Sequence, residues 1–302
     1  MSGNSQFPIP NSQLRDGTQR ATLNWVCAAA GLSVIVALAI WSATAPVAEH
    51  EIGSYATGLK GRASSQIYNV RLATRAINNK VIPPGGVFSF VRTIGSWTAD
   101  LGYVKAPVSY DGELVRSWGG GVCQASSTLY NAALLAGLEI VERHRHHWPA
   151  RYAPLGRDAA VAYSDIDLKF RNNLPAPIRI VGAIEGEKLV FRIMSTCRPD
   201  YSVRVESQVR SVTRPTEVVQ DRTGSGEGRW RLINRGHPGF YVVTYRRFLP
   251  HGVSGFQIPK HQRQSEWSKG GTEIPKHDRE RVELVSEDRY PPLHRVIRIA
   301  ER

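Results

Sequence analysis

Gly119-Gly120-Gly121-Val122-Cys123-Gln124-Ala125-Ser126-Ser127-Thr128-Leu129-Tyr130-Asn131-Ala132 is the stretch that decides how this chain folds. Three adjacent glycines allow backbone conformations that are closed to other residues. Ser126, Ser127 and Thr128 stand before an apolar run and are good helix-capping residues. The pattern therefore predicts a glycine turn that leads into a helix, with Cys123 at or just before the helix start.

A thiol at that place has two interpretations. The positive end of a helix lowers the pKa of a thiol and favours the thiolate, which is the nucleophilic form. Cys123 is then a catalytic nucleophile. Free cysteines are also often buried as small apolar side chains, and in that case Cys123 belongs to the core.

The composition narrows the class of protein. Of the 302 residues, 41% are apolar, which is enough to form a hydrophobic core. The net charge of +13 makes the chain strongly basic. Basic proteins suit anionic partners, and we expect peptidoglycan or another anionic wall polymer. Because no nucleic-acid-binding motif is present, we do not expect nucleic acid. General basicity of a solvated surface is the alternative.

An apolar stretch near the N-terminus predicts a membrane anchor. No charged residue occurs between Arg20 and Glu49, and residues 23–41 are mostly apolar. That length approaches the roughly 30 Å of a bilayer core, so we expect a cytoplasmic tail over 1–22 and a transmembrane helix over 23–45. Arg15 and Arg20 place the rest of the chain outside the cytoplasm. A cleaved signal peptide is the alternative, although Pro46 would directly follow its cleavage site.

The remaining chain divides into a linker over 46–61, a domain over 62–198 and a β-rich C-terminal region over 199–302. The domain is expected to be α+β, with a helix over about 65–78 before the helix that follows Cys123. Short β-branched and aromatic runs predict strands near residues 87–90, 103–108, 114–116, 167–170, 178–184 and 188–194. Further strands are expected near 201–209, 229–234, 239–248, 281–285 and 293–300, with a mobile loop over 251–277.

A family resemblance rests on several of these stretches together. They are Pro83-Pro84-Gly85, Phe88-Ser89-Phe90, Gly102-Tyr103, Gly119–Ala132, Ala136-Gly137-Leu138-Glu139-Ile140, Glu142-Arg143, His146, Gly156-Arg157-Asp158-Ala159 and Asp167-Leu168-Lys169-Phe170-Arg171-Asn172. In this order, over roughly residues 62–184, they resemble the VanW family. Ser127 departs from the usual Thr, and Arg145 and His147 crowd the usual single His.

The resemblance implies a setting and no mechanism. The VanW family is named for an accessory protein of glycopeptide-antibiotic resistance clusters in bacteria, and its members are generally anchored or secreted proteins of the cell envelope. The stretch from Gly236 to Arg246, with Ser286 to Pro292, is similar to a small glycine-rich β module often attached to such proteins. Any mechanism has to be inferred from the individual residues of this chain.

A cysteine nucleophile needs a base and a group that orients the base. His146 occupies the position of the VanW-type His and is the expected base, with Asp158 or Asp167 as orienter. Gln124 or the amides after Gly120 would supply oxyanion donors. The expected binding residues are Gly119, Gly120, Gly121, Ser126 and Arg157. The alternative is that His144 and His146 are solvated cations at a helix end, just after Glu142-Arg143.

Two functions from different classes remain open. One is an envelope protein without catalytic activity whose groove around Gly119–Gly121 binds a wall peptide or glycan. The other is a cysteine-dependent peptidoglycan hydrolase or transpeptidase. No cofactor and no metal are expected, because no metal-ligand spacing or nucleotide fingerprint is present. A disulfide between Cys123 and Cys197 would favour the binding protein.

Overall fold

The computed structural model describes residues 48–110, 113–163, 165–221, 228–251 and 281–300. Strands make up 50% of this part of the chain and helices 17%. The fold is therefore mostly β, and the expected α+β class is wrong. The difference arises because strands the sequence pattern does not reveal join the sheets, and because β10 runs for 13 residues.

One antiparallel sheet of four strands forms the base of the domain. Its order is β1 (His50–Gly58), β9 (Lys188–Ser195), β8 (Ile178–Glu185) and β2 (Val81–Ile82). Strand β1 lies within the stretch expected to be a linker. Its sequence HEIGSYATG lacks a clear apolar alternation, and only pairing with β9 along its whole length makes it a strand.

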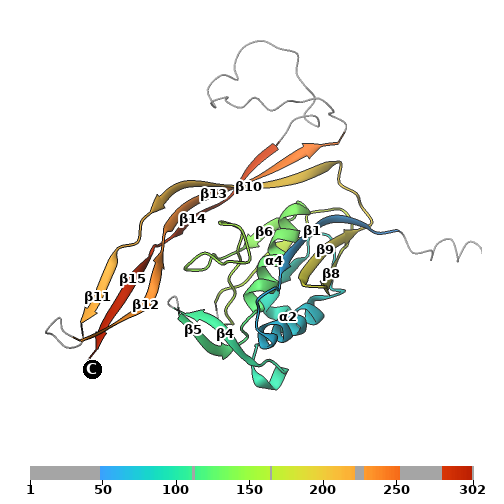
Figure 1. Ribbon diagram of the computed structural model, residues 1–302. Helices are drawn as coiled ribbons and strands as arrows, with labels where there is room; N and C mark the ends of the chain where they lie inside the picture. The colour runs from blue at the N-terminus through green and yellow to red at the C-terminus, as the bar shows by residue number, and fades with distance from the viewer. Residues whose placement is uncertain (1–47, 111–112, 164, 222–227, 252–280, 301–302) are drawn as a thin grey trace, which may run out of the picture. The chain divides into compact units, whose positions relative to one another are not determined.

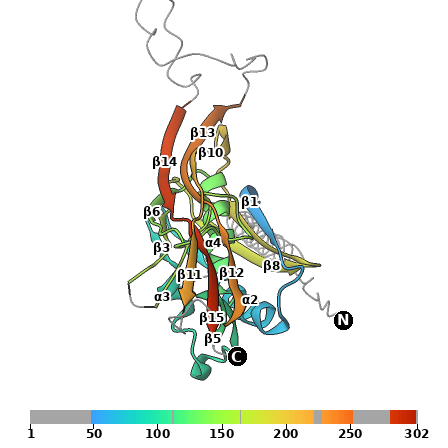
Figure 2. The same ribbon diagram turned by 60° about the vertical axis from the view of Figure 1, so that its left-hand side comes forward.

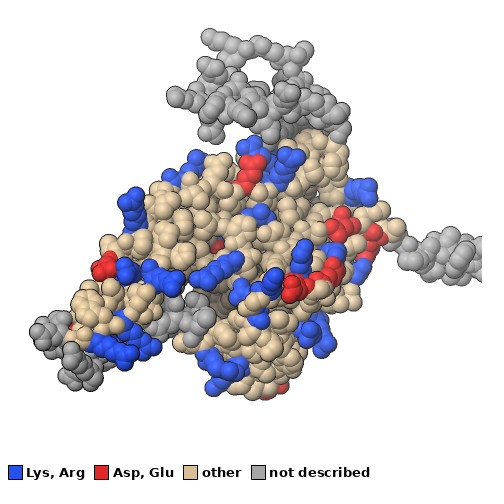
Figure 3. Space-filling view, in the orientation of Figure 1, with Lys and Arg blue, Asp and Glu red and all other residues tan. Residues whose placement is uncertain are grey.

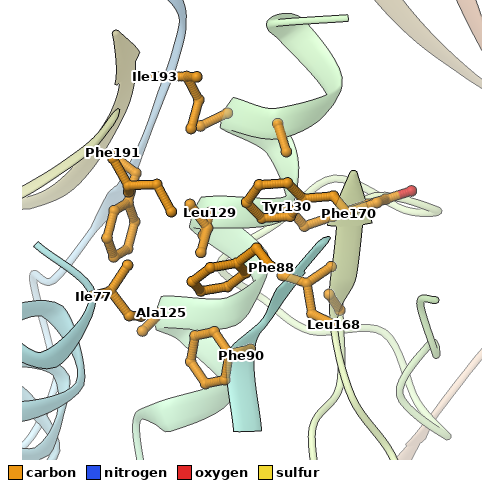
Figure 4. Close-up of a cluster of buried hydrophobic side chains, with 14 of the residues drawn as sticks. Ile77, Phe88, Phe90, Ala125, Leu129, Tyr130, Leu168, Phe170, Phe191 and Ile193 are labelled. Carbon is orange, nitrogen blue, oxygen red and sulfur yellow. The ribbon is translucent and has the colours of Figure 1, made fainter. Parts of the chain in front are cut away.

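Two helices of 14 residues cover this sheet. Helix α2 (Ser64–Ile77) packs against β8, and α4 (Val122–Leu135) packs against β1, β9 and α2 (Figure 1). The short helix α3 (Phe90–Ile94) begins where a strand was expected to end. Figure 4 shows Leu129 of α4 among buried aromatic and aliphatic side chains. They come from segments before the helix, such as Phe88 and Phe90, and after it, such as Phe170 and Phe191.

The three glycines allow α4 to start against its neighbours. Gly121 has a φ of 107°, and a Cβ there would lie 2.6 Å from the carbonyl oxygen of Gln66 in α2. A Cβ on Gly120 would lie 2.7 Å from the Pro107 carbonyl oxygen. Both positions therefore need glycine. The helix starts at Val122, so Ser126, Ser127 and Thr128 lie inside it and are not its caps.

Two smaller sheets complete the domain. Strands β3 (Val87–Ser89), β7 (Lys169–Arg171) and β6 (Glu139–Glu142) form one, in that order. Strands β4 (Lys105–Tyr110) and β5 (Glu113–Trp118) form a hairpin that leads into the glycines. A 3-10 turn, η1 (Ala99–Leu101), precedes the hairpin.

The C-terminal region consists of two three-stranded sheets among the described residues. The first pairs β10 (Tyr201–Thr213), β13 (Gly239–Pro250) and β14 (Arg281–Tyr290). The second places β15 (Leu293–Ala300) between β11 (Glu217–Asp221) and β12 (Arg229–His237), as Figure 2 shows. Of the expected mobile loop over 251–277, residues 252–277 lie outside the described residues.

The expected transmembrane helix over 23–45 also lies outside the described residues. Within the part of the chain that the structure describes, no helix has both the length and the apolar character needed to cross a membrane.

Candidate active site

Cys123 lies in the first turn of α4, as the second residue of the helix. Its side chain is half-buried, and its Sγ donates to the carbonyl oxygen of Val161 at 3.6 Å. The His146 ring lies near enough to the sulfur for each group to shift the pKa of the other. The positive end of the helix favours the thiolate.

His146 is held by Asp158 through two hydrogen bonds to one carboxylate oxygen. The backbone N–H of His146 donates to Asp158 Oδ2 at 2.7 Å, and its Nδ1 lies 2.6 Å from the same oxygen. The other ring nitrogen, Nε2, lies 3.3 Å from the hydroxyl of Tyr152. With Nδ1 held by the carboxylate, Nε2 is the nitrogen left to exchange a proton with the thiol.

These contacts shift three pKa values in the directions that a thiolate–imidazolium pair requires. Burial raises the pKa of Cys123, but hydrogen bonding and attraction to His146 outweigh it, and the net pKa is lowered. Burial opposes the charge on His146, yet its bonds to Asp158 and Cys123 raise its pKa to about 10. Burial also opposes the charge on Asp158, whose bonds with His146 and attraction to Arg143 lower its pKa to about 2.

Polar side chains inside α4 hold the segment that carries Asp158. Ser126 Oγ donates to the Ala159 carbonyl oxygen at 2.6 Å, and the Ala159 N–H donates to Ser127 Oγ at 2.8 Å. Asn131 Nδ2 donates to the carbonyl oxygen of Arg157 at 2.7 Å. All three α4 side chains are fully buried. One helix therefore carries both the thiol and the groups that fix the Asp158 backbone.

The chain between His144 and Ala160 folds back on itself. These two residues form an isolated antiparallel bridge, with the Ala160 N–H donating to the His144 carbonyl oxygen at 2.8 Å. The bridge brings His146 and Asp158, which are 12 residues apart, into contact. His146 thus follows strand β6 and does not stand at a helix end, which removes the alternative of a helix-end cation.

Asp167, the other carboxylate considered, lies elsewhere. Its Oδ2 accepts from Ser89 Oγ at 2.6 Å, and its Oδ1 accepts from the Val91 N–H at 2.9 Å. It is 8% exposed and holds the start of α3. Of the two carboxylates, Asp158 is the one placed against His146.

The other predicted site residues make contacts inside the protein. Gln124 is 2% exposed, and its Nε2 donates to Gly58 O at 2.8 Å and to Thr57 Oγ1 at 3.1 Å, so its amide does not point toward a substrate. Arg157 donates to Asn131 Oδ1 at 2.6 Å and its guanidinium lies over the Tyr55 ring. The Cys123 backbone N–H donates to no acceptor among the described residues, and it is the amide suited to an oxyanion.

Neighbouring atoms occupy the space around the three glycines. Trp97 packs so close to Gly119 that a Cβ there would lie 2.2 Å from its ring, and the neighbouring glycines touch α2 and β4 as described above. The Cβ positions of Gly119, Gly120 and Gly121 are thus occupied by neighbouring atoms, and the expected binding groove there stays a prediction. Beside it, the Trp97 and Tyr163 rings meet edge to face at 6.4 Å, and Tyr163 is 61% exposed. Tyr163 also lines a cavity of about 580 Å³.

Cys123 and Cys197 are both free thiols in the structure. The disulfide that would have removed the nucleophile is not formed between these two described residues.

Some site residues escaped the sequence reasoning. Tyr152 lies beside His146, and Arg143 and Tyr290 both contact Asp158 Oδ1. Ser127 and Asn131 could have been found from the sequence, because polar side chains inside an otherwise apolar helix need buried hydrogen-bond partners. Tyr290 could not, since it lies 132 residues from Asp158.

The comparisons with known proteins agree with the resemblance drawn from the sequence. Residues 65–194 match the model of the family described as VanW like protein. An uncharacterized protein of Bacillus subtilis (strain 168), YoaR, is 38% identical over 152 residues, which cover 50% of each chain. The vancomycin B-type resistance protein VanW of Enterococcus faecalis (strain ATCC 700802 / V583) is 29% identical over 140 residues, covering 45% of this chain and 51% of that protein.

The chain thus spans about half the length of these curated relatives. A solved structure, HP0197-G5, covers 34% of this chain and 100% of its own at 12% identity, but its TM-score of 0.17 is too low to carry an argument about the C-terminal module. The family match and the two relatives confirm the VanW resemblance: residues 65–194 are a VanW-like domain.

Proposed function

We propose that this protein is a cysteine-dependent acyl-transfer enzyme of the bacterial cell envelope that acts on the stem peptide of peptidoglycan. The observation that carries the proposal is the 2.6 Å contact between His146 Nδ1 and Asp158 Oδ2, in a ring that also interacts with Cys123. A thiol, a base and an orienting carboxylate in that order form a nucleophilic triad.

The reaction follows from the placement of these groups. The Cys123 thiolate attacks the carbonyl carbon of a stem-peptide amide, and the oxygen that becomes negative is met by the Cys123 N–H at the start of α4. The C–N bond breaks, and the leaving amine takes a proton from the His146 imidazolium. Water or the amine of a second stem peptide then attacks the thioester and gives its proton to His146, while the C–S bond breaks and the thiolate returns. Water gives hydrolysis, and an amine gives transpeptidation.

The substrate class and setting rest on three supports. The E. faecalis relative is named a vancomycin resistance protein. The net charge of +13 suits an anionic wall. The exposed Tyr163 ring, which meets the half-buried Trp97 edge to face, offers an aromatic surface on which a sugar or an apolar side chain can rest.

We also propose that the domain works outside the cytoplasm, at the cell membrane. The support is the uncharged apolar sequence over 23–41 with Arg15 and Arg20 before it. A protease added to intact protoplasts should digest a C-terminal epitope tag, and full protection of the tag would contradict this location.

The chemistry is tested by the pH dependence of alkylation of Cys123 with iodoacetamide, read by mass spectrometry on the folded full chain. We expect rapid labelling with an apparent pKa well below about 8.5. A His146→Ala variant should return the apparent pKa to that value. His144→Ala is the matched control, because the His144 ring is exposed and lies 3.1 Å from Glu142, while the bridge to Ala160 uses only its backbone.

The binding-protein alternative gives a different result in the same experiment. If Cys123 in the folded chain is inert, or if His146→Ala leaves the labelling profile unchanged, the nucleophile is excluded. Retention of the Cys123→Ala variant on insoluble peptidoglycan would then make wall binding the better account.

A further inference from the structure

Asp158 is held by a strand that lies outside the VanW-like domain. Its Oδ2 takes both bonds to His146, so the other oxygen, Oδ1, determines how the carboxylate is turned. Among the described residues, Oδ1 is contacted by Tyr290 of β14 and by Arg143. The family match ends at residue 194, whereas β14 begins at Arg281.

Tyr290 makes the shorter of the two contacts. Its hydroxyl donates to Asp158 Oδ1 at 2.5 Å and accepts from the Gly156 N–H at 3.1 Å. The side chain is 3% exposed, and the Arg145 guanidinium lies 5.5 Å from the centre of its ring. Both the donor and the acceptor capacity of this hydroxyl are thus used on the segment that carries Asp158.

Arg143 joins Asp158 to a second residue of β14. Its Nε donates to the Asp158 carbonyl oxygen at 2.7 Å, and its Nη2 lies 3.2 Å from Oδ1. Its Nη1 donates to Asp288 Oδ1 at 2.5 Å, and the side chains of Arg143 and Asp288 are only 7% and 6% exposed. A buried ion pair of this kind is costly to break from one side, so Asp288 fixes the place of the guanidinium.

We propose that Tyr290 and Asp288 are positioning residues of the active site, so that strand β14 of the C-terminal sheet completes a triad whose three members all lie in the VanW-like domain. This inference rests on the proposed function. It assigns the C-terminal region a role in the chemistry.

The charged and titratable groups around the triad come from separate parts of the chain. Cys123 comes from α4, the Tyr152 hydroxyl lies 3.3 Å from His146 Nε2 with the Arg62 guanidinium over the Tyr152 ring, Arg143 follows β6, and Asp288 and Tyr290 come from β14. Without the Tyr290 hydroxyl, only the 3.2 Å contact of Arg143 would hold Oδ1. The carboxylate could then turn, and His146 would lose its fixed orientation.

The test uses Tyr290→Phe and Asp288→Asn in the full chain. Phe keeps the ring beneath Arg145, and Asn keeps the size of Asp288 while removing its charge. Tyr245→Phe is the matched control, because Tyr245 lies on β13 of the same sheet and its hydroxyl accepts from Arg210 on the exposed surface. Thermal melting of each variant reports its fold.

Two readouts separate positioning from mere stability. The first is the pH profile of Cys123 alkylation: in Tyr290→Phe we expect its midpoint to move toward the ordinary thiol value, so that the rate at neutral pH falls roughly tenfold for a shift of one pH unit. The second is the His146 Nδ1 proton in NMR, which should exchange faster with water in both variants. Tyr245→Phe should leave both readouts unchanged.

The outcomes distinguish this inference from the proposed function. If folded Tyr290→Phe and Asp288→Asn keep the wild-type profile and the wild-type proton exchange, β14 only supports the fold and the inference is overturned, even while His146→Ala still changes the profile. If His146→Ala has no effect either, the proposed function fails first. Should Tyr290→Phe not fold, the proton exchange in Asp288→Asn decides.

Discussion

Two buried carboxylates follow Cys123 and His146 in the sequence, and their hydrogen bonds predict opposite consequences when each is changed. Asp158→Asn should lower the rate of Cys123 acylation by about a hundredfold or more. General acid–base catalysis contributes a factor of this size, and it is lost when His146 is no longer oriented. Asp167→Asn should leave that rate near wild type. It should instead lower the free energy of unfolding by about 1–3 kcal/mol, since Ser89 and the Val91 N–H lose a charged partner.

Urea denaturation and acylation kinetics on the two variants check this assignment. The reverse pattern, in which Asp167→Asn loses acylation and Asp158→Asn retains it, would contradict the placement of the triad.

Asp158 also makes the stability of the fold depend on pH in the acid range. Its folded pKa of about 2 lies below the ordinary value of 3.8. The stabilisation is therefore fully present above the unfolded pKa and is lost as the pH falls from about 4 through 2. By linkage it amounts to about 2 kcal/mol.

The measurement is the free energy of unfolding between pH 6 and pH 2 in the wild type and in Asp158→Asn. The wild type should fall more steeply than the variant below about pH 4. Parallel curves would show that the Asp158 carboxylate is not stabilised by the fold.

Among the elements, the junction between β5 and α4 depends most directly on glycine. Gly121→Ala should destabilise the fold by about 1–3 kcal/mol beyond the cost of a positive φ, because the added methyl group meets the Gln66 carbonyl oxygen. Gly61→Ala is the control: Gly61 also has a positive φ of 77°, but nothing lies near its Cβ position, and it should cost only about 1–2 kcal/mol. Equal losses in urea denaturation would contradict the close approach of α4 to α2.

The sequence predicts elements well where their own residues decide them. The helix expected over about 65–78 is found at Ser64–Ile77, and the strands expected near 178–184 and 188–194 are β8 and β9. Strands β1 and β6 were missed because both lack a distinct period of two and become strands only by pairing with β9 and β7. Their pairing is non-local, so their own residues give no sign of it.

The candidate site, too, could be predicted only where neighbouring residues in the sequence decide it. A glycine turn followed by a polar-to-apolar helix places Cys123 at a helix start, and that reasoning is local. The choice between Asp158 and Asp167 was out of reach, because the bridge between His144 and Ala160 decides it. Tyr290 and Asp288 could not be predicted either, since the contacts of Tyr290 with Asp158 and of Asp288 with Arg143 exist only after the C-terminal sheet has docked.

For the whole molecule, the net charge of +13 sets the expected behaviour toward the wall. Lys and Arg outnumber Asp and Glu on the face shown in Figure 3. Binding to an anionic wall polymer should weaken steeply as salt shortens the screening length from about 10 Å at 0.1 M to about 3 Å at 1 M. Sedimentation with the anionic polymer and with a neutral polysaccharide checks this, and salt-independent binding to the anionic polymer would contradict a role for the charge.

The central claim is that Cys123 takes an acyl group from a peptidoglycan stem peptide, and the most direct measurement is intact-protein mass spectrometry of the full chain after brief incubation with purified stem peptides and an acid quench. The account predicts a mass increase equal to the acyl part of the peptide, mapped to Cys123, released by hydroxylamine and missing in Cys123→Ala. Turnover of the peptides by Cys123→Ala at the wild-type rate, or a folded wild type with a reactive thiol that never gains the acyl mass from any stem peptide, would contradict it.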